Sequence, residues 1–145
     1  MATRTIKIVA SCISTGALIL DDHGHTPADA GDKIIWQIQN GSGVKSIVSI
    51  DKKFGSPEIF STRPHQQGNV WTGTISSSVP GGTIYDYFIS WTDTNNPSQQ
   101  HTFDPIISIK PTSIFSISKI VMSLLVFFGF SFFFLHNINK ERKSS

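Results

Sequence analysis

Short segments in which hydrophobic and polar residues alternate follow one another through the first 111 residues. In residues 32–39 the alternation places Trp36 on an apolar face, and in residues 83–91 it does the same for Tyr85 and Trp91. A period of two is typical of a β-strand with one buried face. We therefore predict about seven strands, at residues 3–10, 16–20, 32–39, 45–50, 69–75, 83–91 and 103–110.

Segments rich in glycine, proline and small polar residues separate these strands. Residues 21–31 and 51–68 are the longest, and both contain proline, so we expect irregular connections there. In the second one, Phe54, Ile59 and Phe60 are expected to cover one end of the core. Short strands at this spacing, with no helical periodicity before residue 114, are typical of a mainly β fold, a Greek-key β-sandwich or barrel.

A different pattern occupies residues 120–139, which carry no formal charge and include six phenylalanines. A helix rises 1.5 Å per residue, so this segment would span about 30 Å, the thickness of the hydrocarbon core of a bilayer. A buried core helix is the alternative, because the strictly apolar part ends at Leu135. The preceding β unit, however, offers no partner that could enclose a helix apolar on every side. We predict a single transmembrane helix.

The chain then divides into a β-sandwich at 1–111, a short linker at 112–119, the transmembrane helix at 120–139 and a basic tail at 140–145. Two flanking lysines and the phenylalanines are expected to anchor the helix: Lys119, Phe127, Phe128, Phe130, Phe132, Phe133, Phe134 and Lys140. The partner that this pattern implies is the lipid bilayer. Packing against another membrane protein, through the phenylalanines and Gly129, is a second interpretation.

Charge is distributed unevenly between these parts. Residues 1–111 hold eight Lys or Arg and nine Asp or Glu, a balance of −1, whereas the whole chain carries +2. A near-neutral domain lacks the basic surface that nucleic-acid binding requires, so we exclude that class of partner. The cationic tail instead suits an anionic lipid surface.

The N-terminus permits two interpretations. Arg4 and Lys7, followed by an apolar stretch, could begin a signal sequence, and residues 9–12 fit a lipobox. Only three residues separate Lys7 from Ser11, however. The apolar region of a signal sequence needs about 7–15 residues, so we favour a first strand. Cys12, the only cysteine, is expected to be a buried, inert thiol on or beside that strand.

Three motifs in this order resemble the framework of the cupredoxin-like fold, the β-sandwich of the blue-copper proteins. Residues 31–36 (GDKIIW) are similar to the family's G-D-x-[apolar]-x-[aromatic] strand, and residues 82–87 (GTIYDY) to its G-x-x-Y-x-Y strand. Residues 104–109 stand where its final strand would run. The resemblance covers residues 3–111 and implies a cupredoxin-like sandwich, although an immunoglobulin-like sandwich can carry each motif singly.

The copper ligands that the resemblance implies are missing at the matching positions. A blue-copper site needs two imidazoles, a thiolate and a weak axial thioether. Lys45 stands at about the first histidine position, and Ile89 stands at the cysteine position, two residues after Tyr87. No histidine or methionine lies in the loop at residues 92–100. We therefore expect a sandwich that binds no copper in the family's manner and uses no cofactor.

His23 and His25 are the remaining metal candidates. Two histidines two residues apart project the same way if the backbone is extended, and both could then hold one Zn²⁺ or Cu²⁺. A further ligand would have to come from Asp21, Asp22, His65 or His101. Two solvated histidines in a polar loop are the simpler interpretation, and we favour it.

No catalytic motif is present. The sequence lacks a G-x-S-x-G elbow, a phosphate-binding glycine loop and an H-E-x-x-H pair. We therefore predict a membrane-anchored, non-enzymatic binding or interaction module, for example an accessory subunit of a membrane complex. The alternative function is metal binding or electron transfer at an atypical site around His23 and His25.

Two arguments about orientation in the membrane conflict. Lys140, Arg142 and Lys143 outnumber Lys110 and Lys119, which favours a cytoplasmic C-terminus and an exported domain. No credible signal sequence precedes the domain, however, which favours a tail-anchored chain with its domain in the cytoplasm. We predict the second orientation and leave the exported one open.

Overall fold

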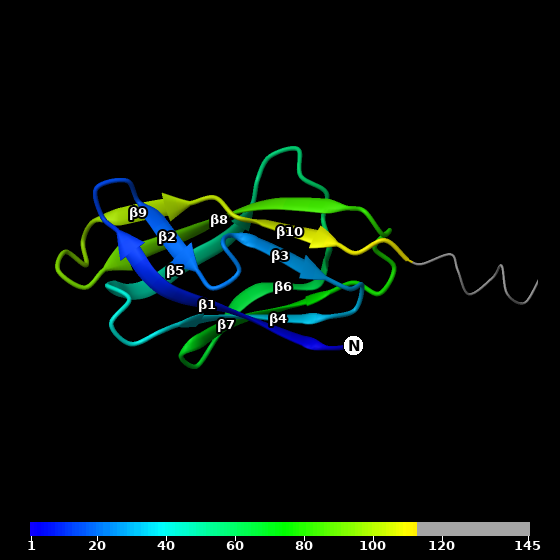
Figure 1. Cartoon of the computed structure of the whole chain (residues 1–145), viewed down its shortest axis with the longest axis horizontal. Coiled ribbons are helices and arrows are strands. Elements are labelled where there is room, and N and C mark those ends of the chain that lie inside the picture. The colour runs from blue at the N-terminus through cyan, green and yellow to red at the C-terminus, as the bar shows by residue number, and fades with distance from the viewer. Residues whose placement is uncertain (113–145) are drawn as a thin grey trace, which may run out of the picture. The chain divides into compact units, whose positions relative to one another are not determined.

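Strands with alternating buried and exposed side chains build the part of the chain that the computed structural model describes, residues 1–112 (Figure 1). There are ten of them: β1 (Thr3–Cys12), β2 (Ala17–Leu20), β3 (His25–Ala28), β4 (Lys33–Ile38), β5 (Val44–Lys52), β6 (Phe60–Gln67), β7 (Val70–Ile75), β8 (Ile84–Asp93), β9 (Gln100–Phe103) and β10 (Ile106–Ile109). Residues Met1–Pro111 form one compact unit.

The strands form two sheets that pack as a β-sandwich (Figure 1). One sheet has the order β2-β1-β4-β7-β6; the other has the order β3-β10-β8-β5, and β9 also pairs with β8. The β1–β4 and β3–β10 pairs are parallel, and the other pairs are antiparallel. The prediction of a mainly β sandwich is confirmed.

One hydrophobic core fills the space between the sheets. Trp36 and Trp91 are fully buried, whereas Trp71 is partly buried and packs against the core. The Trp36 ring lies 6.0 Å from that of Tyr87, and its Nε1 donates a hydrogen bond to the Tyr87 hydroxyl at 3.1 Å. The apolar faces predicted for β4 and β8 therefore pack against this core.

The sequence pattern predicts seven strands and misses some of those present. β3 and β6 lie inside the two segments predicted to be irregular. The predicted last strand, 103–110, holds β10 and only the last residue of β9; residues 104–105 separate the two, and Pro105 has no N–H to donate to the ladder. Both pieces keep one register on β8: Phe103 pairs with Ile89, and Ile106 pairs with Asp86.

The connection before β6 also differs from its prediction at one residue. Ile59 and Phe60 are buried at the end of the core, as expected. Phe54 instead is fully exposed, at 106% of its reference area. It lies in the loop that rises above the sandwich after β5 in Figure 1.

The predicted transmembrane segment, 120–139, and its anchor residues from Lys119 to Lys140 lie outside the described residues, and they stay a prediction. Within residues 1–112, no helix is long and apolar enough to cross a membrane.

Candidate functional site

The two histidines predicted as metal candidates lie in a turn and at the start of a strand. His23 has a φ of 59° and Gly24 a φ of 80°, so the backbone between the histidines is turned rather than extended. His25 begins β3, and its Nε2 forms a hydrogen bond with Ser108 Oγ at 2.7 Å. The geometry under which both imidazoles would project the same way is not present.

The side chains considered as further ligands are engaged or lie on other strands. The Asp22 carboxylate accepts hydrogen bonds from the Gly24 N–H and the Thr26 hydroxyl. His101 lies on β9 and stacks on Trp91, with ring centroids 4.5 Å apart. Among residues 1–112, no three His, Cys, Asp or Glu side chains are grouped as a metal ion would require.

The positions that the resemblance assigns to copper ligands hold side chains that do not ligate. Ile89 is fully buried among the apolar residues of the core. Lys45, near the start of β5, is exposed to solvent. A charged ammonium and an alkyl group supply no lone pair to a metal.

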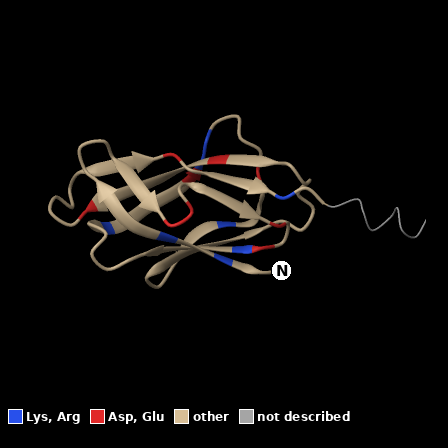
Figure 2. Ribbon diagram, in the orientation of Figure 1, with Lys and Arg blue, Asp and Glu red and all other residues tan. Residues whose placement is uncertain are grey.

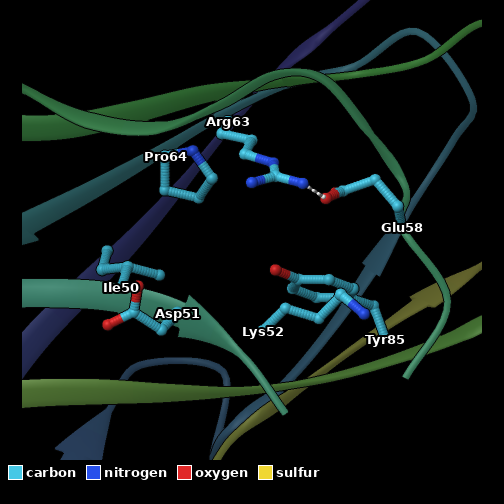
Figure 3. Close-up of a pocket in the computed structure, with 7 residues that line it drawn as sticks. All are labelled: Ile50, Asp51, Lys52, Glu58, Arg63, Pro64 and Tyr85. Atoms are coloured by element: carbon cyan, nitrogen blue, oxygen red, sulfur yellow. Dashed lines mark ion pairs between the residues drawn. The ribbon is translucent and has the colours of Figure 1, made fainter. Parts of the chain in front are cut away.

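A cleft of about 310 Å³ opens between the edges of the two sheets (Figure 3). β5 and β6 are the edge strands on this side, and neither has a further partner strand among residues 1–112. The lining comes from both edges and from the core strand beneath them: Ile50, Asp51, Lys52, Glu58, Arg63, Pro64 and Tyr85. The cleft is therefore accessible from the side of the sandwich.

Tyr85 presents its hydroxyl to this cleft, although its ring belongs to the core. The residue is 2% exposed, and its ring stacks on Tyr87 at 5.6 Å and meets Phe60 edge-on at 5.2 Å. Figure 3 shows the hydroxyl directed into the space bordered by Arg63 and Pro64. Burial, helped by the charge of Glu58, raises the pKa of Tyr85, so the hydroxyl stays protonated at neutral pH.

Charged side chains of both signs surround this hydroxyl. Arg63 and Glu58 form an ion pair at 2.9 Å, and Lys52 Nζ donates a hydrogen bond to the Ser56 carbonyl at 2.6 Å. Asp51 supplies the second carboxylate of the lining. The charges of the two cations and two carboxylates balance, so the cleft is better suited to bind a neutral polar group or a zwitterion than a simple ion.

The residues that line the cleft are suited to hydrogen bonding and ion pairing with a bound group. A protonated tyrosine donates or accepts a hydrogen bond, and no serine, cysteine or histidine is among the lining residues. Four charged side chains and the Tyr85 hydroxyl, set beside Ile50 and Pro64, give the cleft the groups that a recognition site uses to orient a ligand.

The sequence pattern does not reveal this cleft. It assigns Tyr85 to the core alone and treats the whole of 51–68 as irregular, so Arg63 has no predicted position. The cleft exists because β5 and β6, on different sheets, end up on the same side of the sandwich. Local periodicity carries no information about that arrangement.

A second hollow, of about 590 Å³, is formed mainly by the connection between β4 and β5. Its lining is rich in amide and hydroxyl groups, from Gln39, Asn40, Asn69 and Thr94. Lys45 is the one charged residue in that lining. The hollow is wide, and its buried polar side chain, that of Ser42, already accepts a hydrogen bond from the Val44 N–H at 3.3 Å, so we regard the Tyr85 cleft as the better candidate.

Cys12 ends β1, as predicted, but its thiol is exposed rather than buried. The last fully buried residue of β1 is Ile8, so the strand has already left the core where Cys12 stands. Hydrogen bonding by the hydroxyl of Ser14, with Sγ and Oγ 3.3 Å apart, and by Thr15 lowers the pKa of Cys12 to about 7. The prediction of a buried thiol is wrong.

Comparison with known proteins finds likeness only among solved structures. No family model matches this sequence, and no curated protein does. The fold is similar to a pseudoazurin from Sinorhizobium meliloti, at 16% identity and a TM-score of 0.37, with 78% of this chain and 77% of that chain covered. It is also similar to a cysteine protease inhibitor from Entamoeba histolytica, at 11% identity and a TM-score of 0.36, with 76% and 97% covered.

Proposed function

We propose that this chain is a membrane-tethered, non-catalytic binding protein. The observation that supports this most strongly is a self-contained sandwich, Met1–Pro111, followed after eight residues by the uncharged segment 120–139. A domain that buries its own core leaves no apolar surface to enclose such a segment, so a bilayer is the environment that suits it.

We assign the sandwich to the cupredoxin-like architecture without copper. The first and second motifs, residues 31–36 and 82–87, run into β4 and β8, and residues 104–109 contain β10. Ile89 and Lys45 occupy the ligand positions, so such a domain would act through its surface. The Tyr85 cleft is the surface feature best suited to hold a neutral or zwitterionic polar group of a partner.

We propose a tail-anchored arrangement, with the sandwich on the cytoplasmic side of the membrane; residues 3–12, considered as a possible signal sequence, form strand β1 of the sandwich. A role as an accessory subunit would fit this arrangement, because a tethered domain meets membrane partners at high local concentration.

Removal of residues 113–145 tests the tether. We expect the shortened chain to be released from membranes as a folded domain, recognised by the emission of its buried tryptophans and by resistance to proteolysis. The matched control keeps the full length but carries Leu125→Arg and Phe130→Arg in the apolar segment, and it should also be released. Membrane association of the shortened chain after a high-salt wash would overturn the proposal.

A further inference from the structure

The most exposed large apolar side chain of residues 1–112 projects from a fixed turn. Phe54 is 106% exposed. Residues 53–56 form a β-turn closed by a hydrogen bond from the Ser56 N–H to the Lys53 carbonyl at 3.1 Å. Gly55, with a φ of 82°, supplies the positive φ that a type II turn needs at its third residue. The turn therefore presents Phe54 to its surroundings.

Further hydrogen bonds hold this turn against β8. The Lys53 N–H donates to the Asp86 carbonyl at 3.0 Å, and the Asp86 N–H donates to Ser56 Oγ at 2.9 Å. The Lys53 ammonium also pairs with Asp104 and lies 5.1 Å from the centre of the Phe88 ring. Contacts on both sides of Phe54 thus fix the direction in which it projects.

The turn lies close to the point where the chain leaves the sandwich. Asp86 pairs with Ile106 of β10, and β10 ends three residues later, at Ile109. Three residues extend about 10 Å along a strand, and neighbouring strands lie about 5 Å apart. The eight residues 112–119 could reach about 26 Å when extended. A lipid surface that receives the segment 120–139 is therefore within reach of the turn.

A second exposed apolar residue lies between the turn and this exit. Ile84 is 52% exposed and stands two residues before Asp86, on the same face of β8. The charges around the turn nearly balance, because three cations accompany four carboxylates: Lys52, Lys53, Arg63, Asp51, Glu58, Asp86 and Asp104. Figure 2 likewise shows residues of both signs interspersed over the sandwich. The feature that distinguishes this side is therefore apolar rather than electrostatic.

We propose that Phe54 inserts into the interfacial layer of the bilayer, with Ile84 beside it, so that the sandwich lies against the lipid surface. This inference rests on the proposed function, since the tether brings the domain to the membrane. Transfer of an exposed phenylalanine ring from water to the acyl chains is favourable in free energy. The lysines beside it can keep their ammonium groups in water. Because the charges around the turn show no cationic excess, the contact needs no anionic lipid.

A fluorescent reporter on the full chain in reconstituted vesicles tests this contact. Cys12→Ser removes the native thiol, and Phe54→Cys then takes an NBD label in vesicles of zwitterionic phospholipid, with or without nitroxide-labelled acyl chains. Ile19→Cys is the matched control, because Ile19 is 53% exposed on β2 of the other sheet. Ile84→Cys provides a second reporter site. Flotation of the vesicles checks the tether in every sample.

We expect the label at position 54 to emit at shorter wavelength and to be quenched at least about twofold by nitroxide lipid, and the label at position 19 to show neither effect. Equal quenching at the two positions in a protein that floats would overturn the lipid contact and leave the tether intact. A blue shift without lipid quenching would indicate a protein partner and would also overturn it. Failure to float would instead contradict the proposed function.

Discussion

The guanidinium of Arg4 lies 3.1 Å from the buried carboxylate of Asp32. The same carboxylate accepts hydrogen bonds from the N–H groups of Ala2 and Asp29, at 2.7 and 3.0 Å. Burial opposes ionisation of Asp32, but the two N–H groups and the guanidinium outweigh it and lower the pKa. One carboxylate therefore ties the N-terminus and β1 to the turn before β4.

Asp32→Asn should destabilise the sandwich by about 2–3 kcal/mol, because the amide loses the charge that pairs with Arg4 and accepts fewer hydrogen bonds. Urea unfolding of residues 1–112, followed by tryptophan fluorescence, measures the change. Asp29→Asn is the control; its side chain is 51% exposed, so its ion pair with Arg4 should contribute less than about 1 kcal/mol. Equal losses in the two variants would contradict this role of Asp32.

The same carboxylate should make stability depend on pH. Its pKa is lower in the folded chain than in the unfolded one. The contribution of Asp32 to the free energy of unfolding is therefore complete above its unfolded-state pKa of about 4. It is lost as the pH falls through the lower pKa of the folded state. Between about pH 6 and pH 3, the native chain should lose more unfolding free energy than Asp32→Asn. The opposite order would show that Asp32 is not held ionised.

Tyr87 and Tyr85 should respond differently to loss of their hydroxyls. Tyr87→Phe leaves Trp36 Nε1 without the acceptor that it has at 3.1 Å inside the core. The expected cost is about 1–3 kcal/mol in unfolding free energy. Tyr85→Phe removes a hydroxyl that faces the cleft, so its effect should stay within about 0.5 kcal/mol. A larger loss for Tyr85→Phe would mean that its hydroxyl serves the fold rather than the cleft.

Residues with one buried face were predictable from the sequence. Trp36 on β4 and Trp91 on β8 alternate with more exposed residues, and the period of two is visible without any tertiary information. β6 was not predictable, because seven of its eight residues are exposed or only partly buried and it contains Pro64. An edge strand of this kind is defined by its pairing with β7 rather than by its own pattern.

The candidate site could not be predicted either, because strand pairing between distant parts of the chain sets the positions of its elements. β3 contains Pro27 and pairs with β10, about eighty residues later in the chain. The Tyr85 cleft likewise needs β5 and β6 to meet at one side of the sandwich. Cys12 shows why burial could not be predicted from the local pattern. A thiol at the end of a strand is buried only if another segment covers that end, and the pattern of the strand does not indicate whether one does.

Cys12 should react as a thiolate near neutral pH. Its pKa of about 7 lies below the value of about 8.5 for an ordinary cysteine. The rate of alkylation by iodoacetamide should therefore rise with pH around a midpoint near 7 in the folded chain, and nearer 8.5 after unfolding in urea. Ser14→Ala removes a hydrogen bond to the sulfur and should move the folded midpoint upward. A midpoint that is unchanged by unfolding would contradict the effect of Ser14 and Thr15.

Metal addition tests the alternative function. Because the backbone turns at His23 and Gly24, we expect the domain to take up no stoichiometric Cu²⁺ or Zn²⁺ after dialysis, and His23→Ala with His25→Ala to change nothing. Elemental analysis and a visible spectrum after copper addition give the answer. Tight stoichiometric metal that is lost in the double variant would establish a metal-binding protein instead.

Protease protection in sealed vesicles tests the tethered arrangement most directly. The full chain carries one epitope before Met1 and another after Ser145, and protease is added with and without detergent. We predict that the N-terminal epitope is lost from intact vesicles and the C-terminal epitope is protected until detergent is added. Protection of the N-terminal epitope alone would place the sandwich on the other side of the membrane, and loss of both epitopes without detergent would contradict a membrane-spanning segment at 120–139.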